Sequence, residues 1–363
     1  MKPLPTRRTE MVFLSYKASM SDSLETIYLA AKADPNCDAY FIPIPYYDVQ
    51  PNGDLGDMHY EGAEHYPAHL TLTDYRTYNI AQRQPDAIFS YYPYDVRNYV
   101  TRIPSDYFFE NLQLSTDMLV YVPYFVEETT DERFMVQPGP IYADRVIVTS
   151  QRHQANYEAA LRKAGYDQGL DEKIIVLGSP KIDKLLTASP ADFDLPQSWA
   201  TRIRDRQVVL YNTSIAAMLS NPERYFLKLY EVFQHFKDSE RDVLWWRPHP
   251  LLLASYGAMA PTLLSAYKSL LLVYETQEYG ILDTTSDLHR ALAYSDVYYG
   301  DESSLLYLYA FKNQPSIQQN IYDLDEILDL SQDLSHTINI QDCVNQDGTA
   351  GQKIYDYINA QFG

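Results

Sequence analysis

Short apolar segments alternate with helical patterns along most of the chain, and this alternation restricts the fold more than any other feature. The segments have the length of strands, and the residues between them have the spacing of amphipathic helices. Repeated strand–helix units build a parallel sheet covered by helices, so we predict an α/β fold. In the first half we expect strands at Met11–Ser15, Ala39–Pro45, Asp86–Tyr91, Met118–Tyr124, Arg145–Thr149 and Lys173–Leu177, and helices at Asp22–Ala33 and Gln151–Ala164.

The alternation is interrupted between Ala188 and Gln207, where prolines, small polar residues and charges replace the apolar pattern. Because 363 residues exceed what one core usually covers, we expect two domains. The predicted parts are residues 1–190, residues 200–335 and a tail of residues 336–363 with a terminal helix at Gly351–Phe362. In the second half we expect strands at Val208–Asn212, Val243–Arg247, Tyr279–Asp283, Asp296–Tyr299 and Ser316–Gln319, and helices at Pro222–Lys237, Pro261–Leu271, Asp287–Ala293 and Ser303–Phe311.

The charge and the cysteines exclude several kinds of partner and location. A net charge of -20, from 29 basic and 49 acidic residues, opposes diffuse binding to nucleic acid or to an anionic bilayer, so a phosphate must be held by a local site. The first apolar segment, Met11–Leu14, is too short for a signal sequence or a membrane span. Cys37 and Cys343 form neither a metal pattern nor a disulfide framework. We expect a cytoplasmic protein.

Polar residues follow four of the strands expected in the second domain. In doubly wound folds, ligands bind at the carboxyl ends of the strands, so these residues are candidates for one binding site. The four segments are Asn212–Ser214, Arg247–Pro250, Asp283–Thr285 and Gly300–Ser304.

The last of these segments has the pattern of an anion site. Ser303 and Ser304 would begin a helix, where unpaired backbone N–H groups and the helix dipole favour negative charge. The alternative is that Ser303 or Asp301 only caps that helix. Arg247 and His249 could complete a phosphate site with the two serines, although Arg247 could equally pair with one of the many acids.

The first domain has a weaker candidate region after its first strand. Ser15–Ser23 is a loop of small residues in which we expect Lys17 and Asp22 to face a ligand cleft. The alternative is that Ser21 or Asp22 simply caps the following helix.

Two further segments, Ile44–Asp48 and Met58–Gly62, are dense in tyrosine, histidine and acids. They lie in sequence that predicts few strands, and we interpret them as parts of long functional loops. No GxGxxG follows the first strand and no GxxxxGK[ST] occurs, so neither a dinucleotide fold nor a P-loop is indicated.

Four segments together resemble the CDP-glycerol glycerophosphotransferase family, which is related to teichoic-acid primases and polymerases. They read FLSYKASMSDSLETIYLAAKADPNCDAYFIPIPYYD, LYNTSI, DVLWWRPHPLL and GILDTTSDLHRALAYSDVYYGDESSLLYLY, and the resemblance covers most of the chain. It implies a GT-B-like fold, with two Rossmann-like parallel-sheet domains facing across a cleft and a C-terminal helix that crosses back. It also implies that the second domain binds the nucleotide donor and that the first domain lies on the acceptor side.

The resemblance places donor-phosphate roles on Arg247, His249, Thr213, Ser303 and Ser304, and we predict the roles of the other candidates from their positions along the chain. The predicted donor-phosphate residues are Arg247, His249, Thr213, Ser214, Ser303 and Ser304. Asp283 and Thr284 are assigned to the nucleotide base or ribose, and Lys17, Ser19, Tyr47 and Tyr124 to the acceptor side. The implied reaction is attack of an acceptor hydroxyl on CDP-glycerol with CMP leaving, without a required metal or cofactor. We expect Arg247→Ala and His249→Ala each to abolish turnover and to leave the fold intact.

The chain departs from the family at one position. Teichoic-acid polymerases of this kind carry a Trp-His-Gly segment whose histidine is the proposed base, and Val122–Phe125 stands in its place here. The remaining candidates for the base are Asp22, His59 and Glu61, and His249 is a further catalytic candidate.

The expected function is transfer of glycerol phosphate to a hydroxyl of a cell-surface glycopolymer or of its lipid-linked precursor. One alternative is a GT-B glycosyltransferase that uses a nucleotide-sugar for surface polysaccharide or glycoprotein assembly. Another is a non-catalytic nucleotide-binding partner in such an assembly complex. The expected partners are therefore a nucleotide-activated donor and a glycan or lipid-linked acceptor, with no nucleic acid. Peripheral attachment to the inner face of the plasma membrane stays open, because acceptors in this family are commonly lipid-linked.

Overall fold

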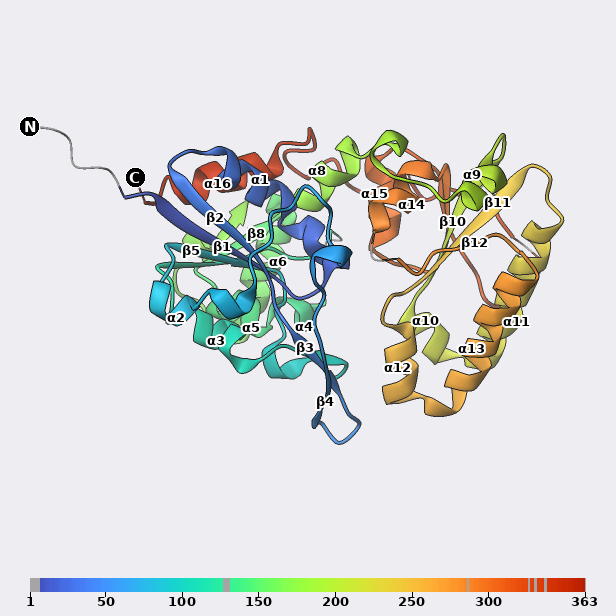
Figure 1. Cartoon of the computed structure of the whole chain (residues 1–363), viewed down its shortest axis with the longest axis horizontal. Helices are drawn as coiled ribbons and strands as arrows, with labels where there is room; N and C mark the ends of the chain where they lie inside the picture. The colour runs from blue at the N-terminus through green and yellow to red at the C-terminus, as the bar shows by residue number, and fades with distance from the viewer. Residues whose placement is uncertain are drawn as a thin grey trace, which may run out of the picture. The chain divides into compact units, whose positions relative to one another are not determined.

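The computed structural model describes residues 7–126, 131–285, 287–325, 327–329, 332–335 and 338–362. The chain divides into two compact units. Unit 1 consists of Met1–Leu186 and Gln341–Gly363, and unit 2 of Thr187–Ile340. Figure 1 shows that each unit contains its own sheet with helices packed around it.

Unit 1 is built on a six-stranded parallel sheet in the order β2-β1-β5-β7-β8-β9. Its strands are β1 (Thr9–Ser15), β2 (Cys37–Pro43), β5 (Ala87–Ser90), β7 (Met118–Tyr121), β8 (Arg145–Val148) and β9 (Ile174–Val176). Each overlaps a predicted strand. Met11–Leu14 is buried along its whole length, because helices cover both faces of a parallel sheet.

The helices of unit 1 follow the strands. They are η1 (Ala18–Ser23), α1 (Glu25–Ala33), η2 (Ala63–His65), η3 (Tyr75–Thr77), α2 (Ile80–Arg83), η4 (Asp95–Arg97), η5 (Ser105–Tyr107), α3 (Phe109–Leu112), α4 (Glu132–Met135), α5 (Pro138–Tyr142), α6 (Gln151–Lys163), α7 (Leu170–Lys173), α8 (Pro180–Thr187) and α16 (Ala350–Asn359). The C-terminal helix α16 lies beside α1 (Figure 1), and the Asp183 carboxylate of α8 accepts hydrogen bonds from the first two N–H groups of α16. The chain therefore returns to unit 1 at its C-terminal end, as predicted.

A small antiparallel sheet corrects the interpretation of Ile44–Asp48 and Met58–Gly62 as long loops. Strands β3 (Tyr46–Val49) and β4 (Leu55–His59) form a hairpin, and β6 (Thr101–Arg102) pairs with β3. The hairpin turns at Asn52-Gly53, where Gly53 has a φ of 87° that side chains disfavour. This Asn-Gly pair was the sequence signal for the hairpin. Because β2 ends at Pro43, the hairpin begins at the carboxyl edge of the main sheet.

Unit 2 has a five-stranded parallel sheet in the order β12-β11-β10-β13-β14. Its strands are β10 (Gln207–Thr213), β11 (Asp242–Pro248), β12 (Ile281–Leu282), β13 (Val297–Gly300) and β14 (Ser316–Gln318). Its helices are η6 (Pro190–Asp192), α9 (Gln197–Ile203), α10 (Ile215–Ser220), α11 (Pro222–Lys237), α12 (Leu252–Met259), α13 (Pro261–Thr276), α14 (Leu288–Tyr294) and α15 (Ser304–Phe311). All five predicted strands and all four predicted helices of this half are present.

The two adjacent tryptophans of β11 pack against helices on opposite faces of the sheet. Successive side chains of a strand point to opposite faces, so Trp246 packs against Phe233 of α11 and Trp245 packs against Trp199 of α9. Both tryptophans are fully buried. In the described parts of both units, no helix combines the length and the apolar character needed to cross a membrane.

Candidate active site

Three neighbouring strands of unit 2 bring their carboxyl ends together, as the strand order requires. The backbone N–H of His249, after β11, donates to the carbonyl of Thr213 on β10 (3.0 Å). The N–H of Asp301, after β13, donates to the carbonyl of Asn212 (3.1 Å). Three of the four predicted segments are thus joined by backbone hydrogen bonds at one edge of the sheet.

The turn from β13 into α15 brings Ser303 and Ser304 to this edge. A Cβ atom on Gly300 would lie 2.3 Å from the carbonyl oxygen of Asn212, so only glycine allows the two strands to approach this closely. Ser303 is the N-cap of α15, and its hydroxyl accepts from the N–H of Leu305 (3.3 Å). The capping alternative is therefore confirmed for Ser303. Ser304 is the first residue of the helix and is half-buried.

Asp301 fixes the turn between β13 and α15 through a network of buried hydrogen bonds. Its Oδ2 accepts from the backbone N–H of Ser214 (2.6 Å) and from the Tyr225 hydroxyl (2.5 Å), and its Oδ1 accepts from the Gln319 amide (2.6 Å). Burial raises the pKa of Asp301, opposed by these donors. Asp301 therefore positions the ends of β10 and β13 and does not cap α15, which contradicts that alternative.

Arg247 and Asp283 form a buried ion pair, and this changes both predicted roles. The Arg247 guanidinium lies 2.9 Å from Asp283 Oδ2 and donates to the carbonyl of Thr285 (2.7 Å), and its side chain is 6% exposed. Asp283 is fully buried and also accepts from the Trp245 indole (3.0 Å), while Arg290 lies 3.3 Å from its second oxygen. Burial opposes ionisation of Asp283, yet the Arg247 charge and the Thr285 donors hold its pKa below the ordinary value.

The prediction that Arg247 holds donor phosphates does not fit this geometry, because its guanidinium is buried and committed to groups of its own unit. The prediction that Asp283 contacts a base or ribose does not fit either, because its side chain is fully buried. The ion pair also argues against the expectation that Arg247→Ala leaves the fold intact, since this substitution would remove the Arg247 cation from the buried Asp283 carboxylate. The sequence left two alternatives for Arg247, phosphate binding and pairing with an acid, and the structure shows the pairing.

The remaining predicted donor-side residues differ in exposure and in the hydrogen bonds that their side chains make. Thr213 is fully buried and its hydroxyl accepts from the Trp246 indole (3.2 Å), so its predicted phosphate contact does not fit. Ser214 caps the short helix α10 through the N–H of Ala217 (3.2 Å). Thr284 is exposed beyond β12, where a nucleotide contact stays a prediction.

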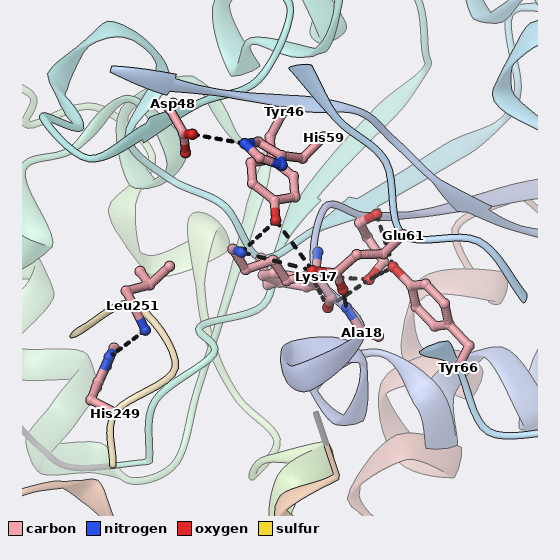
Figure 2. A network of polar contacts seen from close by, with 11 residues as sticks. Lys17, Ala18, Tyr46, Asp48, His59, Glu61, Tyr66, His249 and Leu251 are labelled. Atoms are coloured by element: carbon pink, nitrogen blue, oxygen red, sulfur yellow. Dashed lines mark hydrogen bonds and ion pairs between the residues drawn. The ribbon is translucent and has the colours of Figure 1, made fainter. Parts of the chain in front are cut away.

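His249 is the half-buried side chain at the end of β11. Its Nδ1 accepts a hydrogen bond from the backbone N–H of Leu251 (3.1 Å), as Figure 2 shows. The neutral ring therefore carries its proton on Nε2. A histidine held in this tautomer can donate to a phosphate oxygen.

In unit 1, Lys17, Tyr46 and Glu61 point toward one another (Figure 2). The Lys17 ammonium donates to the Tyr46 hydroxyl (2.8 Å) and lies 3.7 Å from Glu61 Oε1, and Glu61 Oε2 accepts from the backbone N–H of Ala18 (2.7 Å). Burial lowers the pKa of Lys17, opposed by the nearby carboxylates of Glu61 and Asp48. Glu61 thus fixes the segment that follows β1.

His59 lies on the other side of Tyr46. The two rings stack with their centroids 5.1 Å apart, and His59 Nε2 lies 2.8 Å from Asp48 Oδ2 across the hairpin. Ring contacts continue from here through the unit, which accounts for part of the chain's 34 tyrosines. The successive members are His59, Tyr46, Tyr16, Tyr92, Tyr94 and Tyr124.

Asp22 does not join the group of Lys17, Tyr46 and Glu61, because its carboxylate pairs with another lysine. Both of its oxygens lie within 2.7 Å of the Lys181 ammonium from α8, and both side chains are buried. The capping alternative for Ser21 and Asp22 is wrong, because residue 24 precedes α1 and makes no side-chain cap. The other predicted acceptor-side residues, Ser19 on η1, Tyr47 on β3 and Tyr124 after β7, are half-buried. The Tyr124 hydroxyl is 2.7 Å from that of Tyr94.

Sequence reasoning missed the partners that lie far along the chain, such as Lys181 for Asp22 and Gln319 for Asp301. It also missed Tyr46 and Asp48, although both lie in a segment it singled out. Here the Asn52-Gly53 turn was an available signal, since a hairpin about it brings residue 48 toward residue 59. Among the described residues, no group of three or more His, Cys, Asp or Glu side chains could hold a metal ion.

The comparisons with known proteins give the fold. No protein-family model and no curated protein sequence matches the chain. Among solved structures, S. aureus MnaA with UDP is 10% identical, with a TM-score of 0.63 over 98% of this chain and 97% of that one. The UDP-GlcNAc 2-epimerase of Methanocaldococcus jannaschii is 11% identical, with a TM-score of 0.56 over 98% and 100%.

The wall teichoic acid polymerase TagF, solved after a soak with CDP-glycerol, is 15% identical, with a TM-score of 0.59 over 98% of this chain and 89% of that one. These structures share two Rossmann-like units and belong to the GT-B fold. At such identities the likeness establishes the architecture alone. The chain therefore has a GT-B-like fold, which it shares with nucleotide-sugar epimerases and with a teichoic acid polymerase.

Proposed function

We propose that the protein transfers glycerol phosphate from CDP-glycerol to a hydroxyl of a cell-surface glycopolymer or of its lipid-linked precursor. The observation that carries this proposal is that the segments of His249 and of Ser303 and Ser304 both join the end of β10 at one edge of the unit 2 sheet, and these segments resemble the glycerophosphotransferases. The likeness of the fold to TagF, solved with CDP-glycerol, supports it.

The donor phosphates would lie at the start of α15. The backbone N–H and the hydroxyl of Ser304, the first residue of this helix, can donate to phosphate oxygens, and the helix dipole favours their charge. His249 Nε2–H adds a donor from the end of β11, which is separated from β13 by β10. Arg247 contributes indirectly, because its ion pair with Asp283 fixes the backbone that ends in His249.

In the proposed reaction the acceptor oxygen attacks the phosphorus that carries glycerol. A new P–O bond to the acceptor forms, the bond to the bridging oxygen breaks, and CMP leaves with the bonding electrons. The donors at α15 and His249 stabilise the charge that gathers on the phosphates, and a base on the acceptor side takes the hydroxyl proton. The reaction needs no metal or cofactor.

The test is a donor screen that measures nucleotide release, followed by a variant of the phosphate site. We expect CMP release from CDP-glycerol in the presence of a glycan or lipid-linked acceptor. His249→Asn keeps an acceptor for the Leu251 N–H and removes the Nε2–H donor, so it should lower kcat/KM by roughly 100-fold, the usual loss for one such donor. His235→Asn, at an exposed position on α11, is the matched control and should leave the rate unchanged. A His249→Asn enzyme of normal activity would contradict the phosphate site.

A nucleotide-sugar reaction is the second candidate, because the similar structures include UDP-N-acetylglucosamine 2-epimerases. The same phosphate site would then hold UDP. Conversion of UDP-N-acetylglucosamine without any turnover of CDP-glycerol would favour this candidate. Binding of CDP without release of CMP from any acceptor mixture would favour the non-catalytic alternative.

A further inference from the structure

The acceptor-side base is the group that sequence comparison leaves open, and the structure separates its three candidates. Asp22 is closed off, because both of its oxygens are paired with the buried Lys181 ammonium. Glu61 is committed to the segment after β1, since the Ala18 N–H, the Tyr46 hydroxyl and the Lys17 ammonium all approach its oxygens. Both carboxylates are thus engaged by groups of unit 1.

His59 has a different environment. Its Nε2 is engaged by the Asp48 carboxylate at 2.8 Å, so the neutral ring donates from Nε2 and keeps its lone pair on Nδ1. The His59 and Asp48 side chains are 41% and 44% exposed, which leaves the ring open to a ligand. A carboxylate that orients an imidazole in one tautomer is the arrangement that activates a hydroxyl in many hydrolases and transferases.

Two neighbouring side chains, Tyr46 and Asp48, hold this ring in place. Tyr46 stacks under it and is itself fixed by the Lys17 ammonium (Figure 2). Asp48 lies at the irregularity in the β3–β4 pairing, and its carboxylate contacts the ring of His59 on the partner strand. Because the hairpin begins where β2 ends, the ring lies on the side of unit 1 where strand ends and Lys17 meet.

We propose that His59 is the general base that takes the proton of the acceptor hydroxyl, and that Asp48 is its positioning residue. As the acceptor oxygen forms its bond to phosphorus, its proton passes to Nδ1 and the imidazolium is stabilised by Asp48; the proton is later released to solvent. This role rests on the proposed function, and it places the base on the hairpin in place of the absent family histidine after β7.

The test compares His59→Ala, Asp48→Asn and Asp48→Glu in the full chain, with CDP-glycerol as donor and CMP release as readout. His59→Ala should lower kcat by roughly 100- to 10,000-fold with little change in the donor KM, since the donor is bound by unit 2. Added imidazole should restore part of that rate. Asp48→Asn should lower kcat at least about tenfold, and Asp48→Glu should retain more activity than Asp48→Asn, which a purely structural role would not produce.

The control is His65→Ala, which removes another half-exposed histidine that lies beside a carboxylate in the same unit. It should keep the wild-type rate. If the wild-type protein releases no CMP, the proposed function fails and this role fails with it. If the wild type is active while folded His59→Ala, checked by CDP binding and circular dichroism, keeps more than about a third of its kcat, the base assignment is overturned and the function stands.

Discussion

Replacing Asp283 by asparagine should strongly lower the free energy of unfolding of unit 2, because it removes one charge of a buried ion pair. Asp283 is fully buried and Arg247 is 6% exposed, so the cation that remains has little contact with solvent. Breaking a buried pair from one side costs about 3–5 kcal/mol. The Trp245 indole donates to Asp283 Oδ2 and the Thr285 N–H to Oδ1, and asparagine keeps only one of these two oxygens, so the loss reports the charge together with one hydrogen bond.

The assay is urea unfolding followed by tryptophan fluorescence, which is specific for unit 2 because all three tryptophans lie there. Arg247→Met should cost a similar amount, and the double variant Arg247→Met/Asp283→Asn should recover much of the loss, since the only partner of Asp283 whose charge it leaves, within the part of the chain that the structure describes, is Arg290, which is 15% exposed. Glu278→Gln, which removes an exposed partner of Arg202, is the control and should cost less than about 1 kcal/mol. An Asp283→Asn cost in the range of that control would refute the reasoning.

Two further substitutions test the fold around the sites. Gly300→Ala should destabilise unit 2 by about 2 kcal/mol or more and weaken nucleotide binding, because its Cβ would lie 2.3 Å from the Asn212 carbonyl. The control is Gly257→Ala, whose Cβ would lie in open space, and it should be neutral or stabilising in the same urea assay. Burial raises the pKa of Asp95 to about 7, so the folded unit 1 holds a proton that the unfolded chain releases, and its stability should fall as the pH rises from about 4 to about 7. Asp95→Asn should remove that pH dependence, which is worth at most about 4 kcal/mol at 1.4 kcal/mol per pKa unit. The assay is urea unfolding followed by circular dichroism, and an unchanged pH dependence in the variant would contradict the prediction.

The fold of both units could be predicted from the sequence because it depends on local patterns. Apolar segments such as Val243–Arg247 coincide with the strands, and the strand order then requires the ends of β10, β11 and β13 to lie at one edge. The β3–β4 hairpin was missed because its residues are polar and aromatic, so that alternation of apolar and polar residues is weak there. Only the Asn52-Gly53 turn marked it.

The candidate site was harder to predict, because the role of a charged residue depends on partners distant in sequence. Arg247 follows a strand, as phosphate-binding residues do, but the buried Asp283 lies beside it and takes its charge. Asp22 was a plausible base until Lys181, which is contributed by α8, was placed against it. Burial and long-range pairing decide these roles, and neither can be read from spacing.

Phosphorus NMR of CDP-glycerol incubated with the protein and a hydroxyl acceptor tests the central claim most directly. The account predicts that the two diphosphate signals disappear together, with one signal of CMP and one of a new phosphodiester appearing in their place. An intact CDP-glycerol diphosphate beside a converted UDP-sugar, under the same conditions, would contradict glycerol phosphate transfer.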